Sequence, residues 1–278
     1  KIAGLTNESK MNLVSMFFKR EGTDKIALPV VIGSHLDTQP TGGKYDGVLG
    51  VLAGLEIVRT LNDLNIQTKH PILVVNWTNE EGSRFPPAMM ASAGYARIYD
   101  VQTLLSAKDA EGNVFGNELD KIGWKGSEPV GAQKFHCYYE LHIEQGPILE
   151  TEGIDIGIVT HGQGLKWLEF KLNGKEQHTG TTPMNVRKDT SLAMSEIILA
   201  VNNIANQNQP NALGSVGHIE VSPNSRNVIA GETLFTVDIR SPDISKLNKI
   251  GKRVRERQLM KYDRKYKYTK YNNKNKIR

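Results

Sequence analysis

The chain has 278 residues, 38% of them hydrophobic and 23% charged, a composition typical of a globular protein with room for two domains. Its net charge of +5 comes from the C-terminal end, because residues 246–278 hold 14 Lys and Arg against 2 acids, whereas the other 245 residues hold 21 bases and 28 acids. The body is therefore mildly acidic, which argues against nucleic acid as a partner, and no apolar run approaches the roughly 18–20 residues that span a bilayer.

The first part of the chain alternates between strand-like and helix-like segments. We expect strands at 28–34, 71–77, 135–141 and 154–160 and helices at 47–64, 89–98 and 101–107. This alternation predicts an α/β domain with a mainly parallel sheet. In such sheets ligands bind beyond the C-terminal ends of the strands.

The pattern changes after Gly162-Gln163-Gly164. We expect strands at 167–172, 213–221 and 233–240, a helix at 189–206 and a further helix starting near Pro242. The β-α-β-β order predicts a smaller α+β domain. The chain is thus divided into a first domain at 1–162, a second at 163–248 and a basic tail at 249–278.

Three of the predicted strands are followed by ionisable residues. These are His35, Asp37 and Asp46 after the first strand, Glu80 and Glu81 after the second, and His142 at the end of the third. Imidazole and carboxylate groups are the ligands favoured by Zn²⁺, Mn²⁺ and Co²⁺. Two such ions sharing one carboxylate would lower the pKa of a water between them toward about 7.

Each candidate also has an ordinary structural explanation. His35 alone could be a buried, hydrogen-bonded histidine, Glu80-Glu81 a solvated loop end and His142 the cap of a strand. Their joint occurrence at three strand ends favours a metal site. In that site Asp37 is placed to accept the second ring N–H of His35. Three other histidines, His70, His136 and His218, lack acidic or glycine-rich neighbours and are expected to be structural.

Six segments form a specific combination of motifs. They are 33–40 (GSHLDTQP), 44–47 (KYDG), 77–85 (WTNEEGSRF), 140–147 (ELHIEQGP), 178–183 (HTGTTP) and 224–229 (NSRNVI). The combination resembles the metal-dependent amidohydrolases that cleave N-carbamoyl amino acids, namely N-carbamoyl-L-amino-acid hydrolase and yeast-type β-ureidopropionase. Allantoate amidohydrolase is a near relative, and all belong to the aminoacylase/carboxypeptidase metallopeptidase clan. The resemblance covers about residues 10 to 245.

The resemblance implies a role for each motif residue. One divalent ion is held by His35, Asp46 and His142, a second by Asp46 and Glu81, and Glu80 is the general base. The substrate is held or polarised by Gln145, His178, Asn227 and Arg240. His178 can donate to the developing oxyanion, and the planar Arg240 guanidinium can clamp a substrate carboxylate. The alternative for Arg240 is a surface ion pair with Asp238. The second domain is then a lid that also forms a homodimer.

One feature of the family is not found. Its last metal ligand, a histidine in a Gly-His-Asp segment, has no counterpart here, and residues from about 249 onward are rich in Lys and Tyr. We expect this tail to be disordered and to be a truncated or frame-shifted gene end. Binding of single-stranded nucleic acid by its tyrosines and bases is a less favoured alternative. The second ion is therefore expected to be weakly held.

The single cysteine, Cys137, excludes an internal disulfide, fits a reducing compartment and is expected to be buried and inert. We therefore expect a cytoplasmic protein, although the first residue is Lys1 and an upstream segment is left open.

The sequence predicts a hydrolase that splits the linear amide of N-carbamoyl amino acids into amino acid, ammonia and carbon dioxide. Its only predicted partners are a small-molecule substrate and a second copy of the chain. Allantoate hydrolysis, or acyl-amino-acid or peptide cleavage, is the alternative activity. An inactive metal-binding remnant is the alternative of another class.

Overall fold

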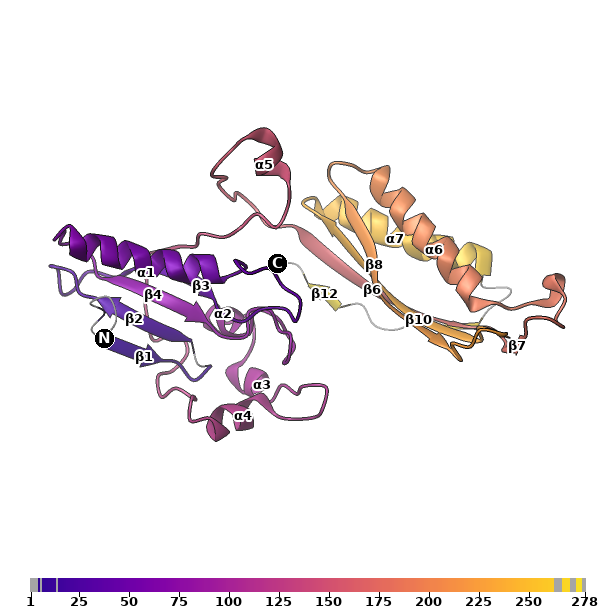
Figure 1. Cartoon of the computed structure of the whole chain (residues 1–278), viewed down its shortest axis with the longest axis horizontal. Coiled ribbons are helices and arrows are strands. Elements are labelled where there is room, and N and C mark those ends of the chain that lie inside the picture. Colours follow the sequence, from indigo (N-terminus) through magenta and orange to yellow (C-terminus); the bar gives the residue numbers. More distant parts are fainter. Residues whose placement is uncertain (1–4, 6, 14, 263–266, 271–273, 277–278) are drawn as a thin grey trace. The chain divides into compact units, whose positions relative to one another are not determined.

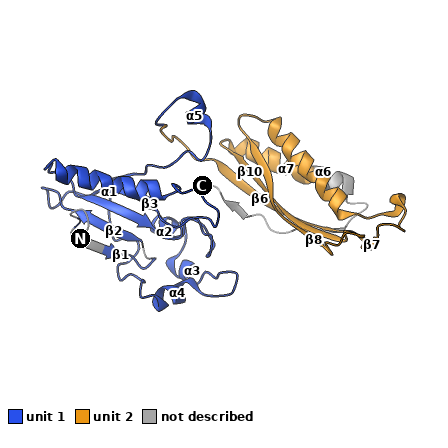
Figure 2. Ribbon diagram, in the orientation of Figure 1, with its two compact units in different colours: residues 1–156 blue, residues 157–278 orange. Residues whose placement is uncertain are grey.

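The computed structural model describes residues 5, 7–13, 15–262, 267–270 and 274–276, with side chains described for residues 5, 9–13 and 15–256. The chain forms two compact units, Lys1–Ile156 and Gly157–Arg278 (Figure 2). The units divide a few residues before the boundary that we placed near 162. Both combine helices with sheets, so the predicted α/β class is confirmed.

Unit 1 is built on a five-stranded sheet in the order β1-β2-β4-β3-β5 (Figure 1). Its elements are β1 (Asn7–Lys10), β2 (Met16–Arg20), β3 (Val30–His35), α1 (Val48–Asp63), β4 (Ile72–Trp77), α2 (Met90–Tyr95), α3 (Val101–Leu105), α4 (Phe115–Lys121), β5 (Cys137–Tyr139) and α5 (Ile148–Glu152). Strand β3 runs parallel to β4 and β5, whereas β2 pairs antiparallel with β4 and β1 with β2. The sheet is therefore mixed, and its parallel part carries the predicted site.

Strands β3 and β4 are buried on both faces, which explains their unbroken apolar runs. Successive side chains of a strand point to opposite faces. Ile32 and Val74 accordingly pack with Val58 of α1 on one face, while Val31 and Val75 join the core that includes residues of α2, α3 and α4 on the other. This packing on both sides fixes where the C-terminal ends of the two strands lie.

Unit 2 is a mainly antiparallel sheet covered on one face by two helices (Figure 1). Its elements are β6 (Gly164–Asn173), β7 (Gln177–His178), the 3₁₀ turn η1 (Met184–Val186), α6 (Thr190–Asn206), β8 (Leu213–Ser222), β9 (Val228–Ile229), β10 (Glu232–Ser241), α7 (Ile244–Tyr262), β11 (Lys267–Lys270) and β12 (Lys274–Lys276). Strand β10 lies between β6 and β8, β11 and β12 pair with β6, and β7 and β9 form a separate two-stranded sheet. Phe170 and Phe235 stack in the core beneath the helices, with ring centroids 5.2 Å apart.

The predicted strand at 154–160 is wrong. This segment has no strand in the structure, and its apolar residues Ile156 and Ile158 are 76% and 88% exposed. A strand needs a neighbour to satisfy its backbone groups, and no strand within the described ranges pairs with this segment. The alternating apolar pattern alone could not reveal that.

The tail predicted to be disordered from 249 onward begins as a helix. Helix α7 continues to Tyr262, and Ile250 and Val254 are buried in the core of unit 2. Together with Leu247 these residues keep the spacing of one helix face, a pattern hidden by the many Lys and Arg on the other face. Residues 263–266, 271–273 and 277–278 of the tail lie outside the described residues.

Cys137 is free but only half-buried, not buried as expected. Within the described sheet β5 is an edge strand, paired on one side with β3. Its other side therefore lacks the neighbour that would cover the thiol.

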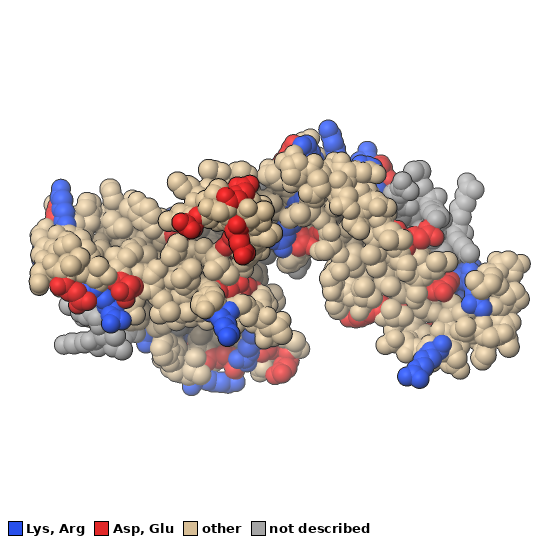
Figure 3. Space-filling model, turned by 45° about the horizontal axis from the view of Figure 1, so that its top comes forward, with Lys and Arg blue, Asp and Glu red and all other residues tan. Residues whose placement is uncertain are grey.

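The described surface carries charges of both signs. On the face drawn in Figure 3, acidic and basic side chains are scattered among uncharged ones. Of the helices that could be searched in the described chain, none combines the length and apolar character that crossing a membrane requires.

Lys166 is a buried lysine that we expect to lower the stability of unit 2. It is 7% exposed, its Nζ donates to Asn248 Oδ1 at 2.7 Å, and Gly251 of α7 leaves room for its stem. Burial, and secondarily Arg255, lowers the pKa of its amine. The unfolded chain then binds more protons than the folded chain between the lowered pKa and the ordinary value, so stability should rise with pH through that window.

A Lys166→Met variant is expected to raise the free energy of unfolding at neutral pH by roughly 1 kcal/mol, because the buried ammonium is removed. The gain should shrink toward about pH 10.5, where the lysine itself is neutral. Urea denaturation at both ends of this range measures the effect. Lys252→Met, at an exposed position of α7, is the matched control and should leave the free energy of unfolding unchanged at both pH values.

Candidate metal centre

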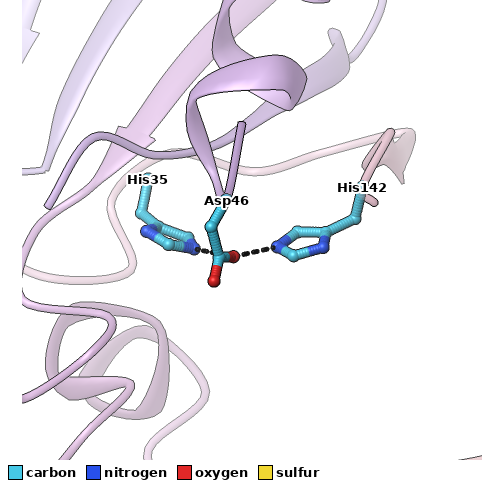
Figure 4. A group of neighbouring side chains, drawn as sticks. All are labelled: His35, Asp46 and His142. Carbon is cyan, nitrogen blue, oxygen red and sulfur yellow. Dashed lines mark ion pairs between the residues drawn. The ribbon is translucent and has the colours of Figure 1, made fainter. Parts of the chain in front are cut away.

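Three predicted ligands meet at the C-terminal ends of β3 and β5 (Figure 4). His35 is the last residue of β3, Asp46 lies in the turn before α1, and His142 follows β5. One ligand atom from each lies within 4.8 Å of the others. Asp46 Oδ1 is 3.2 Å from His142 Nε2 and 4.0 Å from His35 Nε2, so the carboxylate sits between the two rings.

Both histidines present a lone pair to this carboxylate. His35 Nδ1 is 2.8 Å from the carbonyl oxygen of Asp37, and His142 Nδ1 is 2.9 Å from that of Ile143. A carbonyl can only accept, so each Nδ1 carries the proton and each Nε2 is free to bind a cation. Two imidazole nitrogens and one carboxylate oxygen so arranged fit a divalent metal ion.

Asp37 does not play the part that we predicted. Its backbone carbonyl, not its carboxylate, lies against His35 Nδ1, and the carboxylate oxygen is 3.9 Å away. The carboxylate instead accepts from the backbone amides of Glu80 and Glu81 at 3.2 and 3.0 Å. Asp37 therefore fixes the loop of Glu80 and Glu81 beside the candidate ligand group.

The two adjacent glutamates have different surroundings. Glu80 Oε2 is 3.6 Å from His35 Nε2, which brings this carboxylate to the edge of the ligand group. The Glu81 carboxylate accepts from Gln39 Nε2 at 3.0 Å and is not one of the three grouped ligands. Burial raises the pKa of Glu80; His35 opposes this effect, and the nearby carboxylates reinforce it. A partly buried carboxylate with a raised pKa is suited to accepting a proton.

Gln145 also belongs to this cluster. Its side-chain amide donates to Asp46 Oδ2 at 2.6 Å, the carboxylate oxygen that faces away from His142 in the ion pair. Its backbone has a φ of +57°, which is uncommon for a residue with a side chain. The side-chain amide of this predicted substrate-binding residue thus lies against Asp46.

The other three predicted substrate residues lie in unit 2. The short strands β7 and β9 pair His178 with Val228, which brings His178 and Asn227 together, and the carbonyl of Asn227 accepts from the amide of Thr179. Gly180 N–H donates to His178 Nδ1 at 3.0 Å, so a neutral ring carries its proton on Nε2. This tautomer, opposite to that of His35, can donate a hydrogen bond.

Arg240 is apart from that pair. Its Nη2 lies 2.9 Å from Asp238 Oδ2 on the same face of β10, and its Nε donates to the same oxygen at 3.1 Å. This is the surface ion pair that we considered as the alternative.

Sequence reasoning missed a polar network behind the site. Both Ser34 Oγ and Tyr138 OH donate to the Glu140 carboxylate, and Trp77 Nε1 donates to Tyr138 OH at 3.1 Å. Tyr138, Glu140 and His142 alternate in an extended segment and so share one face. The two-residue spacing of these polar side chains is the sequence signal from which the network could have been predicted.

A Gly47→Ala variant is expected to bind zinc at least about 10-fold more weakly. Gly47 has a φ of +72°, and a Cβ there would overlap the ring of His35. The same strain should cost roughly 1 kcal/mol of unfolding free energy. Equilibrium dialysis with zinc and urea denaturation measure the two effects. Gly43→Ala, where a Cβ would meet nothing within 4 Å, should behave as the unmodified chain.

Comparisons with known proteins agree with the geometry. The model of Peptidase family M20/M25/M40 matches residues 31–275. The N-carbamoyl-L-amino-acid amidohydrolase of Rhizobium meliloti is 61% identical over 240 residues, which are 86% of this chain and 58% of that protein. The corresponding protein of Geobacillus stearothermophilus is 40% identical over 226 residues, 80% of this chain and 55% of that one.

Solved structures give the same result. An amidase of the hydantoinase/carbamoylase family from Burkholderia multivorans matches with a TM-score of 0.85 and 44% identity, over 98% of this chain and 66% of that chain. The chain thus spans somewhat more than half the length of the curated relatives it matches.

Proposed function

The chain belongs to Peptidase family M20/M25/M40, and from this membership we propose that it acts in the hydrolysis of N-carbamoyl-L-amino acids to amino acid, ammonia and carbon dioxide. The observation that carries the proposal is the group formed by His35, Asp46 and His142. It occurs in a chain that is 61% identical to an amidohydrolase of that name.

We assign one divalent ion, Zn²⁺, Mn²⁺ or Co²⁺, to His35, Asp46 and His142. When bound, such an ion polarises a carbonyl and lowers the pKa of a water molecule. A second ion would be held by Asp46 and Glu81. We propose that it binds more weakly, because the Glu81 carboxylate is engaged by Gln39 and Asp46 Oδ2 by Gln145.

Glu80 is the proposed general base. It lies beside His35, its loop is held by Asp37, and burial raises the pKa of its carboxyl. It takes the proton from the attacking water and delivers it to the leaving nitrogen.

Four further residues are proposed to bind the substrate. The Nε2–H of His178 donates to the oxyanion, and the amides of Gln145 and Asn227 hold the ureido group. Arg240 gives up its ion pair with Asp238 and binds the substrate carboxylate with two parallel hydrogen bonds. Unit 2 is the proposed lid and homodimer contact, and the single Cys137 fits a cytoplasmic location.

The test is ammonia release from a panel of substrates by the purified chain with added Zn²⁺, Mn²⁺ or Co²⁺. We expect release from N-carbamoyl-L-amino acids that stops when a chelator removes the metal. Hydrolysis of allantoate, an N-acetyl amino acid or a dipeptide in place of these substrates would support the alternative activities. No hydrolysis with any of the metals would support an inactive metal-binding remnant.

A further inference from the structure

Two histidines that the proposed function does not use lie against each other, with tilted rings, at the opposite end of the unit 1 sheet. His70 precedes β4 and His136 precedes β5, and their ring centroids are 4.6 Å apart at an interplanar angle of 32°. Because β3, β4 and β5 are parallel, their N-terminal ends lie together at one end of the strands, and the candidate metal centre lies at the opposite, C-terminal end.

Both residues are anchored to the segment that enters β3. His70 Nδ1 is 2.8 Å from the carbonyl oxygen of Leu28, and the backbone amide of His136 donates to that of Pro29 at 2.8 Å. The carbonyl fixes the proton of the His70 ring on Nδ1 and leaves a lone pair on Nε2. His35 and His142 have the same arrangement in the metal centre.

We propose that His70 and His136 form a separate metal site, which binds one transition-metal ion through an imidazole nitrogen of each, with water as the remaining ligands. Two nitrogens bound at about 2.0–2.1 Å to one cation lie about 3 Å apart. Rings with centroids 4.6 Å apart can reach this separation by rotation about their side-chain bonds. His136 is exposed and His70 partly so, which leaves the ion open to water.

The types of ligand in this site determine which metal ions it prefers. The acids of the segment that leads into β3 are engaged elsewhere: Asp24 Oδ1 accepts from the amides of Ile26 and Ala27, and Glu21 pairs with lysines. A site of imidazoles alone favours Cu²⁺, Ni²⁺ and Zn²⁺ and disfavours Mn²⁺, Mg²⁺ and Ca²⁺, which prefer oxygen. The site links the segments that precede three adjacent strands, β3, β4 and β5. An ion that binds only the folded chain therefore stabilises unit 1 by mass action.

The experiment is equilibrium dialysis of the full chain against Ni²⁺ and, separately, Mn²⁺. His70→Ala and His136→Ala are each expected to bind one Ni²⁺ fewer per chain than the unmodified protein, with Mn²⁺ binding unchanged. His218→Ala is the matched control, since His218 is exposed and paired with Glu220, and it should lose nothing. Ni²⁺ should raise the Tm of the unmodified chain by several degrees and that of the two variants by less.

A second comparison separates this site from the metal centre. His142→Ala should lose Ni²⁺ independently, and the losses in a His70→Ala/His142→Ala double variant should add, because the sites share no ligand. The proposal is wrong if either His70→Ala or His136→Ala binds as much Ni²⁺ as the unmodified chain. A parallel fall in Mn²⁺ binding also contradicts it, because the substitution would then be acting on the centre at His35.

Discussion

An Asp46→Ala variant is expected to lose at least about 100-fold in zinc affinity. Asp46 is the only carboxylate of the three grouped ligands, and its Oδ1 is the atom that faces both Nε2 atoms. Without it the rings of His35 and His142 remain, with centroids 6.0 Å apart, and no anion between them offsets the charge of a cation. Zinc per chain by mass spectrometry, and competition with a chelator, measure the loss.

The controls for this variant lie on the helix that follows Asp46 and in the loop that precedes it. Asp63→Ala removes an exposed carboxylate at the end of α1 and should leave zinc affinity unchanged. Asp37→Asn keeps the backbone carbonyl that fixes His35 but weakens the bonds to the glutamate loop. It should therefore retain most of the zinc. An Asp46→Ala chain with the full zinc affinity of the unmodified protein would show that the ion binds elsewhere.

Elements with an unbroken apolar run or a clear amphipathic spacing could be predicted from the sequence, whereas segments with a misleading pattern or composition could not. Strands β3 and β4 and helices α1 and α6 have runs or spacings that only one structure satisfies, and each was placed within two residues of its observed ends. The segment at 154–160 has an equally good strand pattern but pairs with nothing in the described chain. Helix α7 was expected to start near Pro242, as it does, but its continuation beyond residue 249 was not predicted, because lysines and arginines dominate the composition there.

The grouping of the three candidate ligands could be predicted because their residue types and their positions after apolar strands indicate a metal site. His35, Asp46 and His142 follow apolar strands along the chain, and the structure brings one potential ligand atom from each within 4.8 Å of the others. Hydrogen bonds to particular atoms were not predictable. Whether Asp37 meets His35 through its carbonyl or its carboxylate depends on one backbone rotation that the sequence does not determine. The tautomer of His178 depends in the same way on the amide of Gly180.

A Glu80→Gln variant is expected to lower the rate of ammonia release by roughly 10²–10⁴-fold while the chain keeps its zinc. The amide has the size of the carboxylate and retains an oxygen, and the bond from its own backbone amide to Asp37 does not involve the side chain. What it cannot do is accept a proton at neutral pH. Since Glu80 is not among the grouped ligands, the zinc affinity of the variant should stay within about 10-fold of that of the unmodified chain.

The pairing of these two readouts distinguishes a general base from a ligand. If Glu80 held the ion, Glu80→Gln would lose zinc and activity together, as Asp46→Ala is expected to do. If it acts on the water, activity falls and zinc remains. Glu56→Gln, on the exposed face of α1, applies the same chemical change away from the site and should alter neither. Unchanged ammonia release in Glu80→Gln would remove Glu80 from the catalytic role, and Glu81, one residue along the same loop, would become the residue to test.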